Sequence, residues 1–379
     1  MTKTSSTYDA IVIGVGGMGS AALYHLARRG KKVLGLERYD IPHQMGSSHG
    51  LTRIIRLAYY EHPSYVPLLR RSYELWRALE QEAGEQLLHI TGSVDAGPRD
   101  SDVVQGALRA CQLHQLPHQL LTSPELSARY PGYALPTGHL ALLQPEGGFL
   151  LSERCIVQHV IQAQACGAEV HAREAVLDWE PLADGVRVRT DRGVYTAEKL
   201  VISAGPWASR FIAPLAGKLQ PERQVLAWFQ PLRPPLFALG SFPVFNLKVE
   251  EGRFYGMPVF HIPGFKVGCY HHLGEKVDPD AMDRECHARD EALLRGFVER
   301  YFPAGAGPLM SMRTCIFTNT ADEHFVLGLH PDHPQVAIAA GFSGHGFKFC
   351  SVVGEIMAQL ATEGRSPHDL TLFDLGRLP

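Results

Sequence analysis

A glycine-rich segment near the N-terminus, Gly14-Val15-Gly16-Gly17-Met18-Gly19, restricts the fold more than any other part of this sequence. It follows an apolar run at 10–13 that is typical of a buried parallel strand. Small and apolar residues recur at helical spacing over 21–27, and a second apolar run lies at 33–36. This order predicts a βαβ unit of about 30 residues, which requires a mainly parallel sheet with helices on its faces. We therefore expect an α/β fold.

A dinucleotide site needs each glycine of this GxGxxG pattern for a different reason. Gly14 permits a tight turn, Gly16 lets backbone N–H groups approach a pyrophosphate, and Gly19 allows close helix–strand packing. The N-terminus of the helix then presents unpaired N–H donors to the anion. Glu37 ends the second strand, where its carboxylate can accept hydrogen bonds from a ribose, and Arg38 follows as a further cofactor contact. The alternative is a purely structural turn beside a solvated Glu37.

Two segments farther along the chain favour FAD over NAD(P), which the glycine motif does not separate. Residues 201–205 are the end of a strand and carry small side chains. The connection that follows this strand can therefore run close to a bound cofactor. Residues 341–348 begin at another strand end, and their backbone donors, around Phe342, Gly344 and Gly346, suit a flavin ring. A nicotinamide enzyme does not need a third chain segment, such as 341–348, in contact with its cofactor.

Strands typical of a nucleotide-binding domain occur at the start, in the middle and at the end of the chain. The Rossmann-like cofactor domain is therefore expected to be discontinuous. Aromatic and β-branched residues with frequent Pro and Gly between 216 and 275 predict an antiparallel sheet in a second domain. Helices are expected at 64–83, 280–302 and 351–362. We assign the FAD-binding domain to 1–90, 150–215 and 325–379, and the substrate domain to 91–149 and 216–324.

The composition argues against several classes of protein. The 36 basic and 39 acidic residues give a formal net charge of −3, whereas nucleic-acid-binding proteins usually carry a basic excess. No apolar run reaches the roughly 18 residues of a transmembrane helix, and residues 1–9 lack the apolar segment of a signal peptide. The seven cysteines form no CxxC pair and no HExxH motif occurs, so neither a disulfide framework nor a metal site is expected. We expect a cytoplasmic protein without a membrane or nucleic-acid partner.

A basic, glycine-rich segment at 46–60 contains Ser47, His49, Arg53 and Arg56. The two arginines are three residues apart, which on a helix would place both guanidinium groups on one face. In a cleft they would attract a carboxylate or a reduced-flavin anion, and a bidentate contact would suit an amino-acid substrate. The alternative is a solvated basic surface.

Several of these segments, and others that follow, keep the order of motifs in one known family. They are 14–19 with Glu37, 46–56, 254–258, 264–268, 315–325 and 341–348. With these motifs the sequence resembles the monomeric sarcosine oxidase family, which includes N-methyltryptophan oxidase and pipecolate oxidase. The resemblance covers nearly the whole chain.

The resemblance implies a monomer that oxidises secondary amino acids with FAD and O2. Sarcosine is the first expectation, giving glycine, formaldehyde and H2O2; N-methyltryptophan, L-pipecolate and L-proline are alternatives. A flavin dehydrogenase with another electron acceptor is a rival, as are a flavin-dependent RNA-modifying protein and a non-catalytic nucleotide-binding protein. The low net charge argues against RNA as a partner.

The resemblance also implies roles for particular residues. Cys315 matches the cysteine that attaches FAD through its 8-methyl carbon, whereas by itself it would be an inert buried thiol. Arg56 and Lys348 match the pair that grips the substrate carboxylate. Lys266 matches the lysine over the flavin that promotes reaction with O2, although by itself it would be a strand-edge lysine. The other implied contacts are Arg53 and His49 beside the flavin ring, Ser47 and Lys348 at the cofactor, and Tyr255 in the substrate pocket.

Two adjacent histidines, His271 and His272, stand where some relatives have one. Either could be the histidine of the active site, and we select His272. This departure leaves the shape of the pocket, and hence the preferred amine, open.

Overall fold

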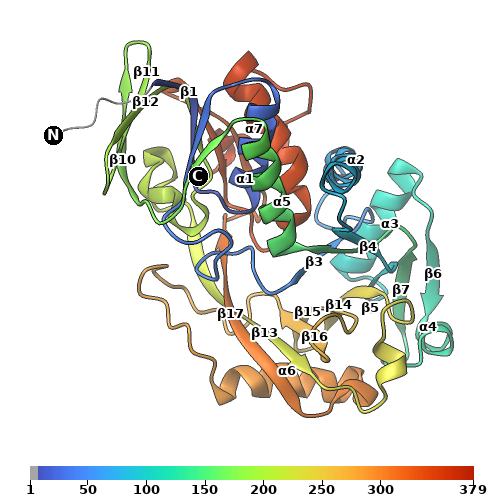
Figure 1. Cartoon of the computed structure of the whole chain (residues 1–379). Coiled ribbons are helices and arrows are strands. Elements are labelled where there is room, and N and C mark those ends of the chain that lie inside the picture. Colours follow the sequence, from blue (N-terminus) through green and yellow to red (C-terminus); the bar gives the residue numbers. More distant parts are fainter. Residues whose placement is uncertain (1–6) are drawn as a thin grey trace.

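The computed structural model describes residues 7–379, which form two large sheets in separate halves of the molecule (Figure 1). Residues 1–6, which belong to the segment used to argue against a signal peptide, lie outside the described residues. Among the described residues, no helix is long and apolar enough to cross a membrane.

The first large sheet is mainly parallel, as the GxGxxG segment predicts. β1 lies between β12 and β2, and β19 and β9 continue the parallel part on either side. The hairpin β10–β11 and strand β18 add antiparallel edges. The strands are β1 (Thr7–Ile13), β2 (Val33–Leu36), β9 (Glu169–His171), β10 (Val176–Leu182), β11 (Gly185–Thr190), β12 (Val194–Ile202), β18 (Val326–His330) and β19 (His333–Ala340).

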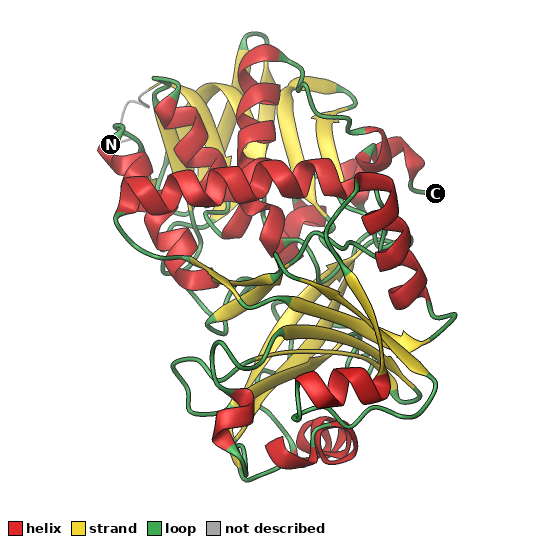
Figure 2. Cartoon of the chain, turned by 90° about the vertical axis from the view of Figure 1, so that its right-hand side faces the viewer, coloured by secondary structure: helices red, strands yellow, loops and turns green. Residues whose placement is uncertain are grey.

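Helices cover this sheet, because its central strands are apolar on both faces. In Figure 2 they cross in front of its strands. α1 packs against α5 and α7, and a Cβ added at Gly354 would lie 2.5 Å from the Cβ of Ala21, so glycine is needed at this crossing. The predicted helices at 64–83 and 351–362 are confirmed. The helices of this half are α1 (Gly17–Arg28), α2 (Tyr65–Ala83), α5 (Ser152–Ala165) and α7 (Cys350–Glu363).

The second large sheet is antiparallel except for the pair β14–β5, which confirms the antiparallel sheet expected between 216 and 275. One of its faces is apolar and packs against α6 (Ala288–Tyr301), through residues such as Phe254 and Phe297. The helix begins later than expected, at a capping box formed by His287 and Asp290. In sheet order the strands are β17 (Leu309–Asn319), β13 (Gln220–Phe229), β16 (Phe265–Cys269), β15 (Gly252–Met257), β14 (Val244–Val249), β5 (Ser93–Pro98), β7 (His139–Gln144) and β6 (Gln119–Thr122).

A small third sheet corrects one sequence expectation. It consists of β3 (Thr52–Ile55), β8 (Gly148–Leu151) and β4 (Leu88–Ile90), in that order. The segment that carries Arg53 is therefore a strand, because its β-branched residues pair with β8. Arg53 lies on this strand and Arg56 directly follows it, so the two arginines do not lie on one face of a helix.

The remaining elements are short. Two further helices are α3 (Asp102–His114) and α4 (Ser123–Arg129). The 3-10 helices are Gly205–Arg210, Ala213–Leu215, Pro234–Phe237, Pro303–Gly305, Phe347–Phe349, Thr371–Phe373 and Leu375–Arg377. We propose that the two large sheets are the cores of the two domains assigned from the sequence.

Candidate active site

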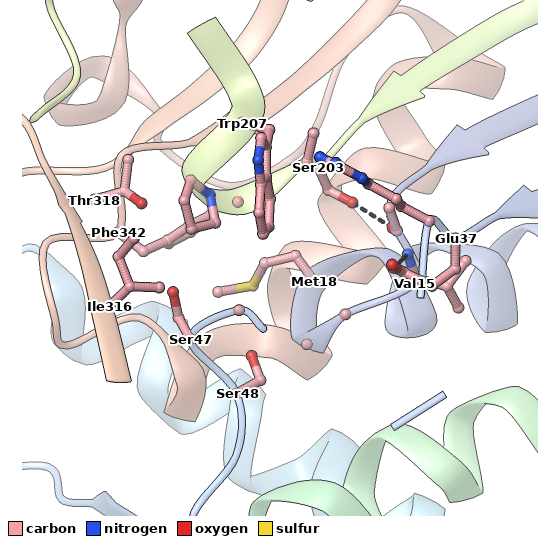
Figure 3. A pocket seen from close by; sticks show the side chains of 18 of the residues that line it. Val15, Met18, Glu37, Ser47, Ser48, Ser203, Trp207, Ile316, Thr318 and Phe342 are labelled. Atoms are coloured by element: carbon pink, nitrogen blue, oxygen red, sulfur yellow. Dashed lines mark hydrogen bonds between the residues drawn. The ribbon is translucent and has the colours of Figure 1, made fainter. Parts of the chain in front are cut away.

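A cavity of about 430 Å³ lies at the carboxyl ends of the central parallel strands. Gly14 follows β1, Glu37 follows β2, Ser203 follows β12 and Gly341 follows β19, and all four residues line the cavity. In parallel α/β sheets this is the edge at which ligands bind. Figure 3 shows Ser47, Ile316, Thr318 and Phe342 at one end and Glu37 with Val15 at the other. Of the predicted cofactor contacts, Gly14, Gly16, Glu37, Arg38, Ser47, Arg53, Phe342, Gly344 and Gly346 line this cavity.

The glycine loop has the geometry that a dinucleotide requires. Gly14 has φ +84°, and a Cβ there would lie 2.7 Å from the carbonyl oxygen of Ser203. A Cβ at Gly19 would lie 1.7 Å from the carbonyl oxygen of Gly14, so helix and strand could not pack as closely. A Cβ at Gly16 would meet nothing within 4 Å, and Gly16 faces the cavity. The loop therefore leaves an open cradle at the N-terminus of α1, which fits a pyrophosphate.

Glu37 also holds this loop in place. Its Oε2 accepts a hydrogen bond from the N–H of Val15 at 2.9 Å, and its Oε1 accepts one from the N–H of Tyr39 at 3.0 Å. A carboxylate that receives backbone donors is fixed in orientation, so the group available to a ribose is also the group that shapes the loop.

The face of the second sheet opposite α6 carries polar residues and packs against the segment at 47–53, part of which lines this cavity. Strand register places Tyr255 opposite Gly268, Met257 opposite Lys266, and Gln224 opposite Cys315. Side chains at alternate positions share one face of a sheet, so Tyr255, Lys266 and Cys315 are brought together although they lie far apart in sequence.

Cys315 and Arg53 meet beside the cavity. The Sγ of the buried Cys315 lies 3.6 Å from Nη2 of Arg53 and 3.8 Å from the carbonyl oxygen of Ser47. The same Nη2 donates to the carbonyl oxygen of Ser47 at 3.0 Å, and Nη1 donates to that of Thr52 at 2.9 Å. Ser47 and Arg53, the two residues that contact the thiol, both line the cavity. The thiol of Cys315 therefore lies next to the space that a ligand would fill at this end of the cavity.

Lys266 is a buried lysine held against the same segment. Its Nζ donates to the carbonyl oxygens of Gly50 at 2.7 Å and Thr52 at 2.8 Å, and to Oγ1 of Thr52 at 3.1 Å. Burial first, and then the charge of Arg53, lower its pKa well below the ordinary value. An anion bound nearby would favour the charged form of Lys266.

His49 lies in this region with both ring nitrogens buried and without a hydrogen-bond partner among residues 7–379. Burial, and then Arg53, lower its pKa to about 3, so the ring is neutral at pH 7. Buried polar atoms are usually paired. Unpaired nitrogens beside Arg53 therefore fit a site completed by a polar cofactor such as a flavin.

Arg56 and Lys348 are brought together around one ring. The guanidinium carbon of Arg56 lies 4.6 Å from the ring centroid of Tyr59, and Nζ of Lys348 lies 5.2 Å from the same centroid. Lys348 also donates to the carbonyl oxygen of His345 at 2.8 Å. Burial, followed by the charge of Arg56, lowers the pKa of Lys348 to about 7. This pair can hold a carboxylate.

Two carboxylates that sequence reasoning missed surround Arg56. Nη2 of Arg56 lies 2.9 and 2.8 Å from the two oxygens of Glu61, and Nε lies 3.7 Å from Oδ1 of Asp95. Burial raises the pKa of Asp95 to about 6, and Asn246 donates to it at 3.0 Å. In the sequence Asp95 stands between the apolar residues Val94 and Ala96, which is a signal for a buried acid, whereas nothing local indicates Glu61.

Comparison with known proteins identifies the family of this chain. Residues 9–360 match the family model described as FAD dependent oxidoreductase. The monomeric sarcosine oxidase of Bacillus sp. (strain NS-129) is 44% identical over 98% of this chain and 97% of its own length. The N-methyl-L-tryptophan oxidase of Yersinia pestis is 33% identical over 98% and 99%. The chain belongs to the monomeric sarcosine oxidase family. It is thus an FAD-dependent oxidoreductase.

Solved structures agree with this family assignment. NikD, described as an unusual amino acid oxidase essential for nikkomycin biosynthesis, has a TM-score of 0.85 and 27% identity, covering 98% of both chains. The L-proline dehydrogenase from P. horikoshii shares the fold, with a TM-score of 0.84 over 99% of this chain and 98% of that one.

The expectation that His272 is the histidine of the active site needs correction. Its Nε2 lies 2.9 Å from Oδ1 of Asp290, whose carboxylate is also paired with Arg223, on the side of the sheet covered by α6. His272 therefore lies apart from the cavity residues, because its side chain is bound to the buried ion pair of Asp290 and Arg223. His271 instead lies 3.2 Å from both oxygens of Glu222 and 2.9 Å from Oε1 of Glu323. These contacts raise its pKa to about 9.

Replacing Gly16 by alanine is expected to lower the affinity for FAD by about tenfold or more while the protein still folds. The added methyl group meets no protein atom, but it keeps the backbone from approaching the pyrophosphate. FAD titration of the apoprotein measures the affinity, and circular dichroism measures folding. Gly296→Ala is the matched control, because a Cβ there also meets nothing and α6 is remote from the cavity. Equal FAD affinity in both variants would refute the assigned role.

Proposed function

We propose that this protein is an oxidase of N-methyl and other secondary amino acids, with sarcosine as the first substrate to test. Sarcosine, O2 and water would give glycine, formaldehyde and H2O2. The observation that carries the proposal is the buried pair Arg56 and Lys348, which shares the ring of Tyr59. Lys348 directly follows Phe347, which lines the dinucleotide cavity. Relatives named sarcosine oxidase support the same activity.

FAD, when bound, would supply the hydride acceptor and the route by which electrons reach O2. Arg56 and Lys348 would hold the substrate carboxylate, and this contact would orient the C–H bond that is broken. Their charges would also lower the pKa of the substrate amine, so that it reacts unprotonated. Nη2 of Arg56 donates to both carboxylate oxygens of Glu61. A substrate carboxylate would therefore have to replace Glu61 at this nitrogen or share the contact with it.

The remaining predicted residues would act around the reacting atoms. Arg53 and His49 would lie beside the flavin ring, and Tyr255 would form a wall of the substrate pocket. Lys266 would serve the reaction with O2, because a buried cation stabilises negative charge that develops on oxygen. A cofactor role of Lys348 in addition to substrate binding is part of the same proposal.

We further propose that the protein acts as a monomer in the cytoplasm, without nucleic-acid or membrane partners. Several relatives are named monomeric. All seven cysteines are unpaired, which suits a reducing compartment, and the net charge of −3 does not favour nucleic acid.

Replacing Cys315 by serine is expected to abolish covalent attachment of FAD while leaving noncovalent binding in the cavity. A hydroxyl at this position does not form the stable thioether that a cysteine sulfur would provide. Retention of flavin fluorescence after denaturing electrophoresis measures attachment. Cys350→Ser is the control, since Cys350 is also buried and near the cavity residue Phe347 but is expected to carry no flavin. Flavin that remains attached in Cys315→Ser would place the linkage elsewhere.

Binding of a simple carboxylate should weaken as pH rises through about 7. Lys348 is charged below its pKa of about 7 and neutral above it, so the free protein loses one positive charge at the site. The dissociation constant of propionate, which has no amine to titrate, should rise by up to tenfold per pH unit. Calorimetry measures it. In Lys348→Met the rise above pH 7 should vanish, while any step near pH 6 from Asp95 should remain. An unchanged profile above pH 7 would contradict the assignment.

Peroxide release by the purified protein tests the proposed function directly. Sarcosine, N-methyltryptophan, L-pipecolate and L-proline should be compared under air, with glycine as the unmethylated control. Peroxide from sarcosine or another secondary amino acid supports the oxidase. Bleaching of the flavin without oxygen, but no peroxide under air, would indicate a dehydrogenase that uses another acceptor.

A further inference from the structure

Arg253 is a cation close to the proposed substrate site that has no role in the reaction described above. It lies on β15 two residues before Tyr255, so both side chains share the face of the sheet opposite α6. Its side chain is 14% exposed. The guanidinium carbon lies 3.9 Å from the ring centroid of Tyr270 and 5.5 Å from that of Tyr60. Two aromatic rings therefore hold the guanidinium in place.

Within residues 7–379 the guanidinium of Arg253 donates no hydrogen bond, and its one ion pair is long. The nearest carboxylate oxygen, Oε2 of Glu323, lies 3.6 Å away, which is longer than a hydrogen bond, and no other acceptor contacts the guanidinium within residues 7–379. Glu323 is instead paired with His271 at 2.9 Å. Glu61, the other acid that influences Arg253, is held by Arg56. Since both acids are engaged, the donors of Arg253 are available to a ligand.

Arg253 also lies within reach of the group that is proposed to bind the substrate carboxylate. The ring centroid of Tyr60 is 4.2 Å from the guanidinium carbon of Arg56 and 5.5 Å from that of Arg253, so the two carbons are within 9.7 Å of each other. One dicarboxylic amino acid can bridge two guanidinium groups at such a separation.

We propose that Arg253 is a specificity residue that binds an anionic group on the side chain of the substrate. The preferred substrates would then be secondary amino acids with a second carboxylate, of the N-methylglutamate or N-methylaspartate type. This inference rests on the proposed function, because it takes Arg56 and Lys348 as the site of the α-carboxylate. A second fixed guanidinium binds a carboxylate in preference to the corresponding neutral amide. The amide has the same shape, but it cannot accept two charge-assisted hydrogen bonds.

The test compares an acid with its isosteric amide. In the unaltered protein, kcat/KM for N-methyl-L-glutamate should exceed that for N-methyl-L-glutamine by about tenfold or more. Arg253→Met should bring this ratio to about one, with kcat/KM for sarcosine changed by less than about threefold. Arg253→Lys should keep part of the preference, because it retains the charge but not the planar donor pair. The control is Arg129→Met. Arg129 is an exposed arginine at the end of α4, and its guanidinium carbon lies 5.6 Å from the ring centroid of Tyr130.

A ratio of one or less in the unaltered protein, or a ratio that Arg253→Met does not change, would overturn the proposal. So would an equal loss of sarcosine and N-methylglutamate turnover in Arg253→Met, which would indicate a merely structural cation. Calorimetric binding of succinate and butanoate separates this proposal from the proposed function. If no amine yields peroxide but succinate binds more tightly than butanoate through Arg253, the proposed function fails and the anion site stands. If sarcosine yields peroxide without any preference for the acid or for succinate, the function stands and the anion site fails.

Discussion

Replacing Lys266 by methionine is expected to slow the reaction of the reduced enzyme with O2 by about 10³-fold, while reduction by sarcosine changes far less. Methionine has a similar length but no charge, so the packing between β16 and the segment at 50–52 is largely kept. What is lost is the Nζ that three acceptors of Gly50 and Thr52 hold in a fixed position. A preorganised cation in a site that excludes water stabilises charge on oxygen more than a solvated one does.

Stopped-flow absorbance resolves the two half-reactions of this Lys266 variant. Anaerobic mixing with sarcosine gives the rate of reduction, and mixing the reduced protein with O2 gives the rate of reoxidation. Lys199→Met, a substitution on β12 in the other half of the molecule, should leave both rates unchanged. Equal slowing of both half-reactions by Lys266→Met would show that the lysine supports the structure of the site rather than the reaction with O2.

Replacing Arg56 by methionine is expected to lower kcat/KM for sarcosine by about 10²–10³-fold. The substitution removes the guanidinium that would bind the substrate carboxylate in a bidentate contact, and it leaves Lys348 as the remaining cation at the site. It also leaves Glu61 and Asp95 without the charge that balances them in a buried place. Removal of one partner from a buried ion pair costs about 3–5 kcal/mol, so the variant should also unfold at lower temperature.

A second substitution separates these two effects of Arg56. In the double variant Arg56→Met/Glu61→Gln the buried charge of Glu61 is gone, so part of the thermal stability should return while activity does not. Arg56→Lys should bind the substrate carboxylate better than Arg56→Met but less well than arginine, because a point charge replaces a planar fork. Steady-state kinetics and calorimetric melting measure both quantities. Recovery of activity in the double variant would refute direct binding of the carboxylate by Arg56.

The local parts of this protein were predictable from sequence because they depend on short-range geometry. The strand, glycine turn and helix around Gly14–Gly19 follow from spacing within a single βαβ unit, and the structure contains them. The helices at 64–83 and 351–362 follow in the same way from apolar periodicity. The segment at 46–60 shows the limit, since a spacing of three has one meaning on a helix and another on a strand, and pairing with β8 decided between them.

The arrangement of the candidate site was decided by the tertiary structure alone. Nothing near Lys348 in sequence indicates Arg56, and only the packing of residues 345–349 against Tyr59 brings the two cations to one ring. Likewise, His272 was selected over its neighbour, but a long-range partner on α6 holds it away from the cavity. Sequence by itself therefore determined which chemical groups the chain carries and which short segments hold them. The faces on which those groups meet depend on strand register and on buried charge pairing between distant segments, which no local pattern encodes.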